Sequence, residues 1–301
     1  MQRPFYIVGP TASGKSSIAM TLAERAGGEI VNADAFQLYR GLDIVTAKPS
    51  PADRGRVPHH LYDVLDPDEY CDAQRLREMA LPIIADIQSR GRLPIVVGGS
   101  GLYIKALTHG LAKLPGRDEA IRERLATLTP EERRDQLLSL DPKAATNVPL
   151  SNPRYVERAL EICLLTGRPQ SELRNTFADV KPDGHGVVLS LDRERLYERI
   201  RARVLAMMAA GLVEEIRALG DLSITAEKAI GIRDMRRFFA GECTEDEAVE
   251  AIVLATRRYA KRQITWFRRE AWLQTICLTD DSTAESATSQ ILNQFPSLLA
   301  K

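Results

Sequence analysis

The sequence predicts an α/β fold: a P-loop core whose mostly parallel sheet is flanked by helices, with a helical domain inserted into it. Three observations support this prediction. Short apolar runs alternate with segments of helical periodicity, a glycine-rich loop joins the first run to the first helical segment, and a middle stretch contains helical patterns alone. We therefore expect the first part of the core in residues 1–115, a helical insertion in residues 116–184, and the remainder of the core in residues 185–301 with the basic helix.

The chain begins with a phosphate-binding loop. Residues 5–8 form an apolar run typical of a buried strand, and a helical pattern opens at Ser16. Between them the pattern G-x-x-x-x-G-K-[ST] is made by Gly9, Pro10, Thr11, Ala12, Ser13, Gly14, Lys15 and Ser16. A glycine loop between strand and helix directs backbone N–H groups and a positive helix end toward a phosphate. Lys15 adds a charge and Ser16 a hydroxyl suited to Mg²⁺, so we expect a phosphorylated ligand here.

A carboxylate follows the second predicted strand. Residues 29–33 are strand-like, and Asp34 stands at their C-terminal end. Ligands of open α/β sheets bind beyond the carboxyl ends of the strands, so Asp34 is expected to face whatever the P-loop holds. The alternative is that Asp34 only caps the short turn at residues 35–39, a common role for Asp.

The predicted strand at residues 92–97 ends without an acidic residue. P-loop nucleotidases usually carry an aspartate that holds Mg²⁺ at this point, whereas Gly98, Gly99 and Ser100 follow here. Small residues would allow a substrate to pass close to the backbone, although an ordinary strand-to-helix turn is the alternative.

Periodicity and capping signals predict the other elements. They are helices at 71–89, 152–166 and 193–210, an edge strand at 61–65, core strands at 186–191 and 274–278, and helices that begin at the capping boxes of Thr129 and Thr244.

Composition favours a globular, cytoplasmic protein. The 301 residues are 44% hydrophobic and 27% charged, no apolar run could span a membrane, and the first predicted strand leaves no room for a signal peptide. The four cysteines form no C-x-x-C pair, so neither a disulfide framework nor a zinc site is expected.

The net charge is zero, but the cations are unevenly distributed. Residues 256–269 contain six Lys or Arg residues, three aromatic residues and no acidic residue. Cations interleaved with aromatic rings suit a surface that contacts phosphates and bases. A solvated helix face is the alternative explanation.

Six ordered blocks together resemble the tRNA dimethylallyltransferase family, the bacterial tRNA isopentenyltransferases. The resemblance extends over roughly residues 4 to 275. The blocks are Gly9–Ser16, Asn32–Tyr39 with Asp43–Pro49, Gly98–Tyr103, Asn152–Glu161, Ala229–Arg233 and Tyr259–Arg268.

The resemblance implies transfer of a dimethylallyl group from dimethylallyl diphosphate to N6 of adenosine 37, in tRNAs that read codons beginning with U. Mg²⁺ is the implied cofactor, held by Ser16, and residues 9–16 would bind the diphosphate. Asp34 would be the general base, Ser100 would hydrogen-bond near the reacting groups, and Arg203 would contact the diphosphate. The implied partners are the tRNA anticodon stem-loop and dimethylallyl diphosphate, with no membrane and a monomeric protein.

The resemblance also implies a set of tRNA contacts, in which Gln37 would hold the target base after it leaves the loop stack. The implied contact residues are Asp34, Ala35, Phe36, Gln37, Ser100, Arg122, Arg154, Tyr155, Val156, Glu157, Arg158, Ala229, Ile230, Gly231, Ile232, Arg233, Asp234, Lys261, Arg262, Gln263, Thr265, Trp266 and Arg268.

The chain departs from the family pattern at four positions. Ala35 stands where the family usually has Ser, Ser100 where it has Thr, Val45 where it has Gly, and Ile232 where it has Tyr. These departures affect individual contacts and leave the implied reaction intact.

Three other functions remain open at this stage. A nucleotide or small-molecule kinase would use the same P-loop but would need the missing acidic residue. A non-enzymatic P-loop RNA-binding protein would keep its RNA affinity without Asp34 and would transfer no prenyl group. An adenylate isopentenyltransferase that acts on the free nucleotide would need neither the inserted helices nor that basic helix.

Overall fold

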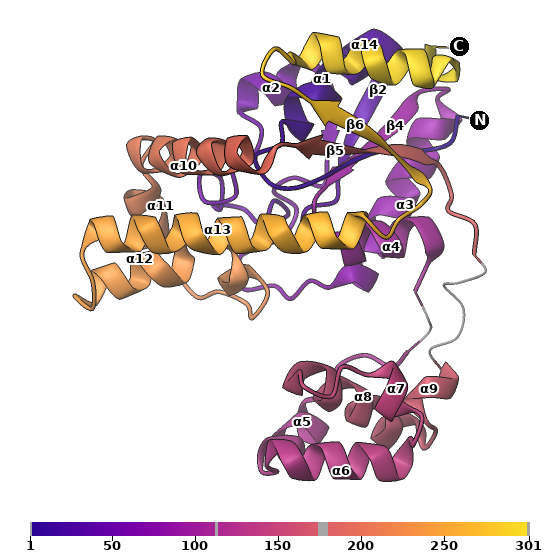
Figure 1. Ribbon diagram of the computed structural model, residues 1–301, viewed down its shortest axis with the longest axis vertical. Helices are drawn as coiled ribbons and strands as arrows, with labels where there is room; N and C mark the ends of the chain where they lie inside the picture. The colour runs from indigo at the N-terminus through magenta and orange to yellow at the C-terminus, as the bar shows by residue number, and fades with distance from the viewer. Residues whose placement is uncertain (1, 112–113, 174–179, 300–301) are drawn as a thin grey trace. The chain divides into compact units, whose positions relative to one another are not determined.

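The computed structural model describes residues 2–111, 114–173 and 180–299. Its contacts divide the chain into two compact units, one made by Met1–Thr108 with Pro182–Lys301 and the other by His109–Lys181 (Figure 1). The first unit is the α/β core, and the described part of the second is helical. No described helix is long and apolar enough to cross a membrane.

One six-stranded sheet forms the centre of the first unit. All neighbouring strands are parallel, in the order β3-β2-β4-β1-β5-β6. The apolar runs found in the sequence occupy its middle, where a strand is covered on both faces and therefore contains few polar residues. The strands are β1 (Phe5–Val8), β2 (Gly28–Asn32), β3 (His59–His60), β4 (Leu93–Gly98), β5 (His185–Leu191) and β6 (Leu273–Leu278).

Helices cover both faces of the sheet. Ile18 and Leu22 of α1 share one core with Ile291 of α14 and with Phe5 and Ile7 of β1. α3 contacts β2 and β4 from the opposite face (Figure 1). These layers leave the carboxyl ends of the strands free for loops. The flanking helices of the sheet are α1 (Lys15–Ala26), α2 (Pro51–Arg56), α3 (Ala73–Ser89), α4 (Gly101–His109) and α14 (Ala284–Gln294), followed by the short helix η2 (Pro296–Leu299).

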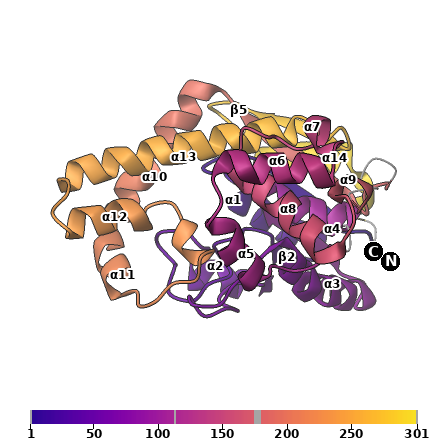
Figure 2. The ribbon, with the colours of Figure 1, turned by 90° about the horizontal axis from the view of Figure 1, so that it is seen from below.

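A group of helices extends the first unit beside these loops. α10 lies alongside α13, and α12 packs against α13 (Figures 1 and 2). The capping box of Thr244 and Glu247 starts α13, which confirms the predicted beginning of this helix. These helices are α10 (Arg193–Ala209), α11 (Leu212–Ala218), η1 (Ala226–Lys228), α12 (Ile232–Phe239) and α13 (Glu245–Phe267).

The second unit has its own small core. Leu125, Leu137 and Leu160 are buried together, and the predicted capping box of Thr129 and Glu132 starts α6. Its helices are α5 (Glu119–Ala126), α6 (Pro130–Leu140), α7 (Ala144–Asn147), α8 (Pro153–Thr166) and α9 (Gln170–Leu173).

The prediction of an edge strand at residues 61–65 was wrong. The edge strand is β3, two residues earlier, and Leu61 and Asp63 adopt left-handed conformations with φ of 63° and 55°. Side chains impose this path, because Lys48 and Arg54 both bind the carboxylate of Asp63. Residues 61–65, four of them apolar or aromatic, therefore form a loop that supports the site described next.

Candidate active site

Three loops meet at the carboxyl edge of the sheet. The strands β2, β4 and β1 are neighbours, so the segments that follow them lie side by side, and these carry Asp34, Ser100 and the P-loop. The approach is close, since a Cβ on Gly98 would lie 2.4 Å from the carbonyl oxygen of Ala33. The structure thus brings together the phosphate loop, the carboxylate and the hydroxyl that the sequence analysis singled out.

The P-loop has the backbone of an anion-binding loop. Gly9, Ala12 and Gly14 have φ of 146°, 62° and 91°, as in loops whose successive N–H groups can point to one anion. α1 begins at Lys15 with no side-chain cap and no acidic residue in its first turn, which leaves its first N–H groups available to a ligand. Ser13 is fully buried, and its hydroxyl has no hydrogen-bond partner among the described residues.

Two cations and one carboxylate interact above this loop. Burial lowers the pKa of Lys15 to about 8, with the negative charge of Asp34 opposing the shift and the positive charge of Arg203 adding to it. Burial also lowers the pKa of Arg203, again opposed by Asp34. The Arg203 guanidinium, from α10, donates to Thr11 Oγ1 and to the Thr46 carbonyl, both at 3.2 Å. The site is therefore cationic and partly dry, as a site for a diphosphate should be.

The carboxylate of Asp34 is held in a fixed orientation. Its Oδ1 accepts the Phe36 N–H at 2.9 Å, so the predicted capping of the following turn occurs without removing Asp34 from the site. Asn32 is completely buried, and its Oδ1 accepts the Asp34 N–H at 2.8 Å while its amide donates to the Leu61 carbonyl at 2.9 Å. No described residue donates a hydrogen bond to Asp34 Oδ2, which leaves that oxygen for a substrate proton.

Ser100 and Tyr259 complete this side of the site. Ser100 Oγ accepts the N–H of Ala35 at 3.3 Å. Burial raises the pKa of Tyr259 to about 12, reinforced by the nearby charge of Asp34 and opposed by hydrogen bonds with Ser100 and Gln263. Tyr259 thus remains a neutral phenol at physiological pH and links α13 to the hydroxyl of Ser100.

Gln263 connects the P-loop to the loop after β4. Its Oε1 accepts the Thr11 N–H at 2.8 Å, and its Nε2 donates to the Gly99 carbonyl at 2.9 Å. A Cβ on Gly99 would lie 2.1 Å from Gln263 Nε2, and a Cβ on Gly101 would lie 2.3 Å from Trp266 Cδ1. Gly99, which suggested a substrate passing near the backbone, and Gly101 are thus needed for the close packing of α13.

A pocket with largely apolar walls lies beside these groups. Its volume is about 60 Å³, with Asp34 and Arg203 among its lining residues. Such a mixture suits a ligand with an apolar part next to a reacting polar group. The other lining residues are Thr11, Phe36, Val45, Thr46, Val204, Met207, Ala229, Ile230, Ile252, Thr256 and Tyr259.

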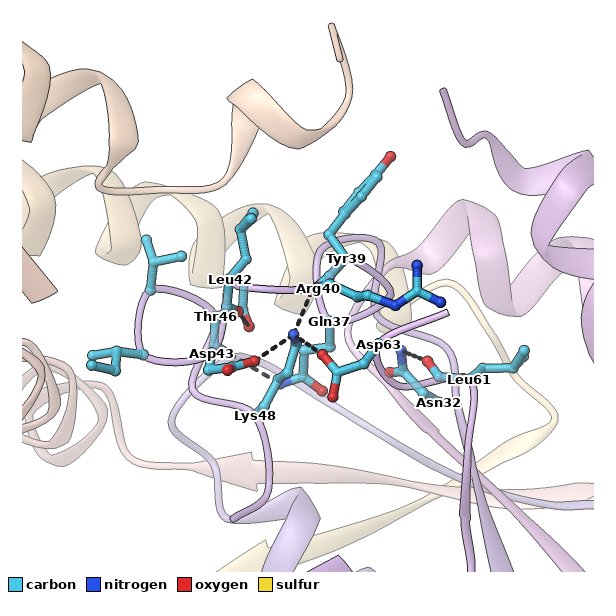
Figure 3. Close-up of polar contacts among 12 residues, drawn as sticks. Asn32, Gln37, Tyr39, Arg40, Leu42, Asp43, Thr46, Lys48, Leu61 and Asp63 are labelled. Carbon is cyan, nitrogen blue, oxygen red and sulfur yellow. Dashed lines mark hydrogen bonds and ion pairs between the residues drawn. The ribbon is translucent and has the colours of Figure 1, made fainter. Parts of the chain in front are cut away.

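The loop that forms one wall of this pocket is organised by a buried lysine. Lys48 Nζ binds the carbonyl of Tyr39 and the carboxylates of Asp43 and Asp63, as Figure 3 shows. Gln37 donates from Nε2 to the carbonyls of Thr46 and Ala47 at 3.0 and 3.2 Å. The amide nitrogen of Gln37, which was expected to hold a base, is therefore engaged in supporting its own loop.

Comparison with known proteins identifies the family. The family model described as IPP transferase matches residues 37–270, and the one described as isopentenyl transferase matches residues 3–57. A tRNA dimethylallyltransferase of Geobacter sulfurreducens is 47% identical over 274 residues, which is 88% of each chain. That of Akkermansia muciniphila is 42% identical over 289 residues, 96% of this chain and 98% of its own.

The chain belongs to the IPP transferase family. This membership confirms the resemblance to the tRNA dimethylallyltransferases and identifies a prenyltransferase, which decides against a kinase and against a non-enzymatic RNA-binding protein.

Solved structures agree with this family assignment. The tRNA isopentenylpyrophosphate transferase of Bacillus halodurans has a TM-score of 0.72 and 35% identity, covering 99% of this chain and 97% of its own. A eukaryotic dimethylallyltransferase, studied while acting on tRNA, has a TM-score of 0.83 and 27% identity, covering 99% of this chain and 80% of its own. The predicted fold class is therefore confirmed over the whole chain.

In this IPP transferase, some of the expected tRNA contacts of the second unit are exposed, and others are buried or paired within the unit. Arg154 and Tyr155 are exposed at the start of α8, whereas Val156 is buried in the unit's core and Glu157 is half-buried beside Arg133. The remaining two arginines belong to an internal ion cluster, described next.

Arg122 and Arg158 both bind a fully buried carboxylate. Arg122 contacts Glu161 at 2.9 and 3.0 Å, and Arg158 contacts it at 2.6 Å. Burial would raise the pKa of Glu161, but hydrogen bonds from Arg122, the Asp118 N–H and Arg158 outweigh it and hold the pKa at about 2. These arginines therefore have a structural partner, which the sequence pattern did not reveal.

The expected contacts in the first unit also divide between surface and interior. Arg233 is exposed and Asp234 half-buried, while Ala229 and Ile230 line the pocket. Gly231 is buried with φ of 116°, and Ile232 is fully buried, so the isoleucine that replaces the usual tyrosine packs inside. On α13, Gln263 is buried, and the exposed residues are Lys261, Arg262, Thr265, Trp266 and Arg268.

Four residues that shape the site were missed by the sequence analysis. Asn32 and Lys48 bond to groups of the surrounding loops, and Tyr259 lies beside Ser100. Glu215 of α11 accepts the N–H groups of residues 43–45 at 3.0, 2.7 and 2.8 Å. Only the Asn32–Asp34 spacing carried a local signal, because a buried Asn two residues before a functional Asp can bond to its backbone.

Proposed function

We propose that this protein transfers the dimethylallyl group of dimethylallyl diphosphate to N6 of adenosine 37, in tRNAs that read codons beginning with U. The observation that carries the proposal is the convergence of Asp34 and Arg203 on a largely apolar pocket beside the P-loop, where Lys15 interacts with both charges. The cationic loop suits the diphosphate, the apolar wall suits the dimethylallyl group, and the free carboxylate oxygen suits the proton that N6 loses. The names of the relatives support the same activity.

The reaction requires little beyond stabilisation of charge. The C1–O bond of the allylic diphosphate breaks and its electron pair leaves with diphosphate, while the adenine N6 forms a bond to C1. Lys15, Arg203 and the N–H groups of the P-loop stabilise the negative charge that develops on the leaving group.

Asp34 takes the proton that N6 loses. An adenine amine is a weak nucleophile, so a base at the moment of attack accelerates transfer. Asp34 suits this role because Asn32 and Phe36 fix its orientation while Oδ2 stays free of protein donors in the described structure. Ser100, bonded to Ala35 and adjacent to Tyr259, is placed to hydrogen-bond near the reacting groups.

Mg²⁺ is the cofactor of the proposal, and Ser16 would hold it. The Ser16 hydroxyl is exposed at the start of α1 and makes no hydrogen bond within the described residues. No described cluster of three or more His, Cys, Asp or Glu residues could hold a metal, but Mg²⁺ at a phosphate site usually takes one or two protein ligands together with phosphate oxygens and water. When bound, Mg²⁺ would supply charge neutralisation for the diphosphate.

The tRNA would be bound through both units. The exposed cations of α13 and the exposed start of α8 suit contacts with phosphates and unstacked bases. We propose residues 116–184 as the helical domain that contacts tRNA, in a monomeric protein of the cytoplasm that acts on the anticodon stem-loop.

The test is a transfer assay with three acceptors. Purified protein, dimethylallyl diphosphate and Mg²⁺ are incubated with an unmodified tRNA whose adenosine 37 has adenosine neighbours, with the same tRNA carrying guanosine 37, or with AMP. Mass spectrometry of the nucleosides is expected to show one added dimethylallyl group on the first acceptor alone. Prenylation of AMP without prenylation of tRNA, or ATP hydrolysis with no prenylated nucleoside, would contradict the proposal.

A further inference from the structure

A second pocket adjoins the proposed active site. It has a volume of about 360 Å³, is open to solvent, and lies between α10 and the loop that runs from Asp43 into α2. Its walls are mostly apolar, and its apolar residues outside the shared boundary are Ile44, Ala47, Pro49, Pro51, Ala206 and Ala210.

The two pockets share two lining residues, Arg203 and Met207, which lie one turn apart on α10. The loop forms the rest of the boundary, since Val45 and Thr46 face the active-site pocket while Ile44 and Ala47 line the second pocket. The Arg203 guanidinium is fixed by Thr11 and Thr46. Met207 is thus the apolar side chain at the boundary between the pockets in the described structure.

The charges on the loop side of the second pocket are compensated, and Arg203 on the α10 side hydrogen-bonds to Thr11 and Thr46. Lys48 is bound by Asp43 and Asp63, as Figure 3 shows, and Arg54 is bound by Asp63. A hydrocarbon chain entering this pocket would meet apolar walls without stripping solvent from an unpaired charge. The pocket therefore suits the continuation of a prenyl chain better than it suits a second anion.

We propose that Met207 limits the length of the prenyl chain by closing the active-site pocket against the second pocket. The inference rests on the proposed function and adds the determinant of donor length. A thioether side chain is flexible and apolar, so it fills the boundary without blocking the smaller donor. Replacement by a small residue joins the two pockets and provides space for one further isoprene unit.

The longer donor reacts by the same balanced step. The C1–O bond of geranyl diphosphate breaks, its electron pair leaves with diphosphate, N6 bonds to C1, and the N6 proton passes to Asp34. The additional isoprene unit would lie beyond position 207, against Ala206 and Ala210.

The experiment compares Met207→Ala with Met208→Ala, a matched control of the same residue type that lines neither pocket. Transfer from dimethylallyl and from geranyl diphosphate to tRNA is measured for each protein. For Met207→Ala, the ratio of geranyl to dimethylallyl kcat/KM should rise by about 10-fold or more over wild type, as expected when a chain of several methylenes gains space. Met208→Ala should keep the wild-type ratio.

Two further variants make the result decisive. Met207→Val removes less of the side chain and should raise the ratio by a smaller factor, which also serves if Met207→Ala does not fold. Ala206→Phe added to Met207→Ala refills the second pocket and should return the ratio toward wild type.

An unchanged ratio in Met207→Ala or Met207→Val, with dimethylallyl transfer retained, would overturn the role of Met207 and leave the proposed function standing. Absence of dimethylallyl transfer in the wild-type protein would overturn the proposed function itself.

Discussion

Lys15 is the residue whose protonation sets the charge of the phosphate loop. Burial holds its pKa at about 8, so the ammonium loses its proton as the pH rises through that value. We predict that kcat/KM for dimethylallyl diphosphate, which reports the free enzyme, falls by up to about tenfold per pH unit above the pKa. A pH–rate profile between neutral and alkaline pH measures this.

Lys15→Arg provides the control for this profile. Its guanidinium stays charged throughout the range, so the variant should be less active but show a flatter alkaline limb. An identical alkaline decline in both proteins would assign the titration to another group.

At the residue level, the sequence revealed residues that belong to local patterns and missed those whose partners are set by the folded loops. The P-loop and Asp34 are defined by their neighbours in the chain. Lys48 is defined by Tyr39, Asp43 and Asp63, whose positions depend on the folded loop. Composition offers no signal for such a partner set.

Among the structural elements, α13 determines the geometry of the site more than its basic residues suggested. Gln263 joins the P-loop to Gly99, where a Cβ would meet its amide at 2.1 Å. We predict that Gly99→Ala reduces kcat by about 100-fold. Gln263 or the loop must move to relieve this contact, and that movement misplaces the reacting groups. Steady-state kinetics measure the loss.

A second substitution tests the physical cause. Gln263→Ala added to Gly99→Ala removes the clash, so the double variant should be more active than Gly99→Ala alone, a non-additive result. Gly220→Ala, where an added Cβ has no neighbour within 4 Å, should leave kcat unchanged. A double variant no better than Gly99→Ala would show that the clash with Gln263 is not the cause.

α8 carries the ion cluster that holds the second unit together. Glu161 is fully buried, and its carboxylate must be ionised to bind Arg122 and Arg158. We predict that Glu161→Gln destabilises this unit by about 1.5–3 kcal/mol, because the buried side chain loses its charge-assisted hydrogen bonds to two half-buried guanidinium groups. Hydrogen exchange of the α8 amides in the full chain measures the loss.

The pH dependence follows from the same cluster. The folded pKa of Glu161, about 2, lies below its ordinary value of 4.5, so this stabilisation is present above 4.5 and is lost as the pH falls toward 2. Glu131→Gln, at an exposed position of α6, should leave the exchange unchanged. Unchanged protection in Glu161→Gln would mean that the two arginines serve RNA binding alone.

The elements themselves were predictable where apolar periodicity and capping agree, as at α13, whereas α6 was predicted from its capping box alone. The strand expected at residues 61–65 failed because its apolar pattern was outweighed by the bonds of Asp63 and by the Asn32–Leu61 contact. Such side-chain bonds to distant residues decide the backbone path and are not encoded in local propensity.

For the whole molecule, a net charge of zero is compatible with an uneven distribution of positive and negative side chains. Exposed cations cluster at the end of α13 and just after it, so tRNA binding should depend on salt although the total charge cancels. We predict that Lys261→Ala and Arg268→Ala each reduce the slope of log affinity against log salt by about 1, since each removes one phosphate contact. Titrations of tRNA at several salt concentrations measure the slopes.

Arg25→Ala is the control for these titrations, because Arg25 on α1 bonds to Ser289 and Glu285 of the α14 segment. Its slope should equal that of the wild type. Equal slopes for all three variants and the wild type would remove α13 from the tRNA interface.

The most direct test of Asp34 as the general base is the Asp34→Asn variant, assayed for prenyl transfer and for tRNA affinity in parallel. The amide keeps the shape of the side chain and can still accept the Phe36 N–H, but it cannot take a proton from N6. We predict loss of dimethylallyl transfer by at least about 100-fold, a typical effect of removing a general base, with tRNA affinity unchanged. Full transfer activity in Asp34→Asn would contradict the central role of Asp34.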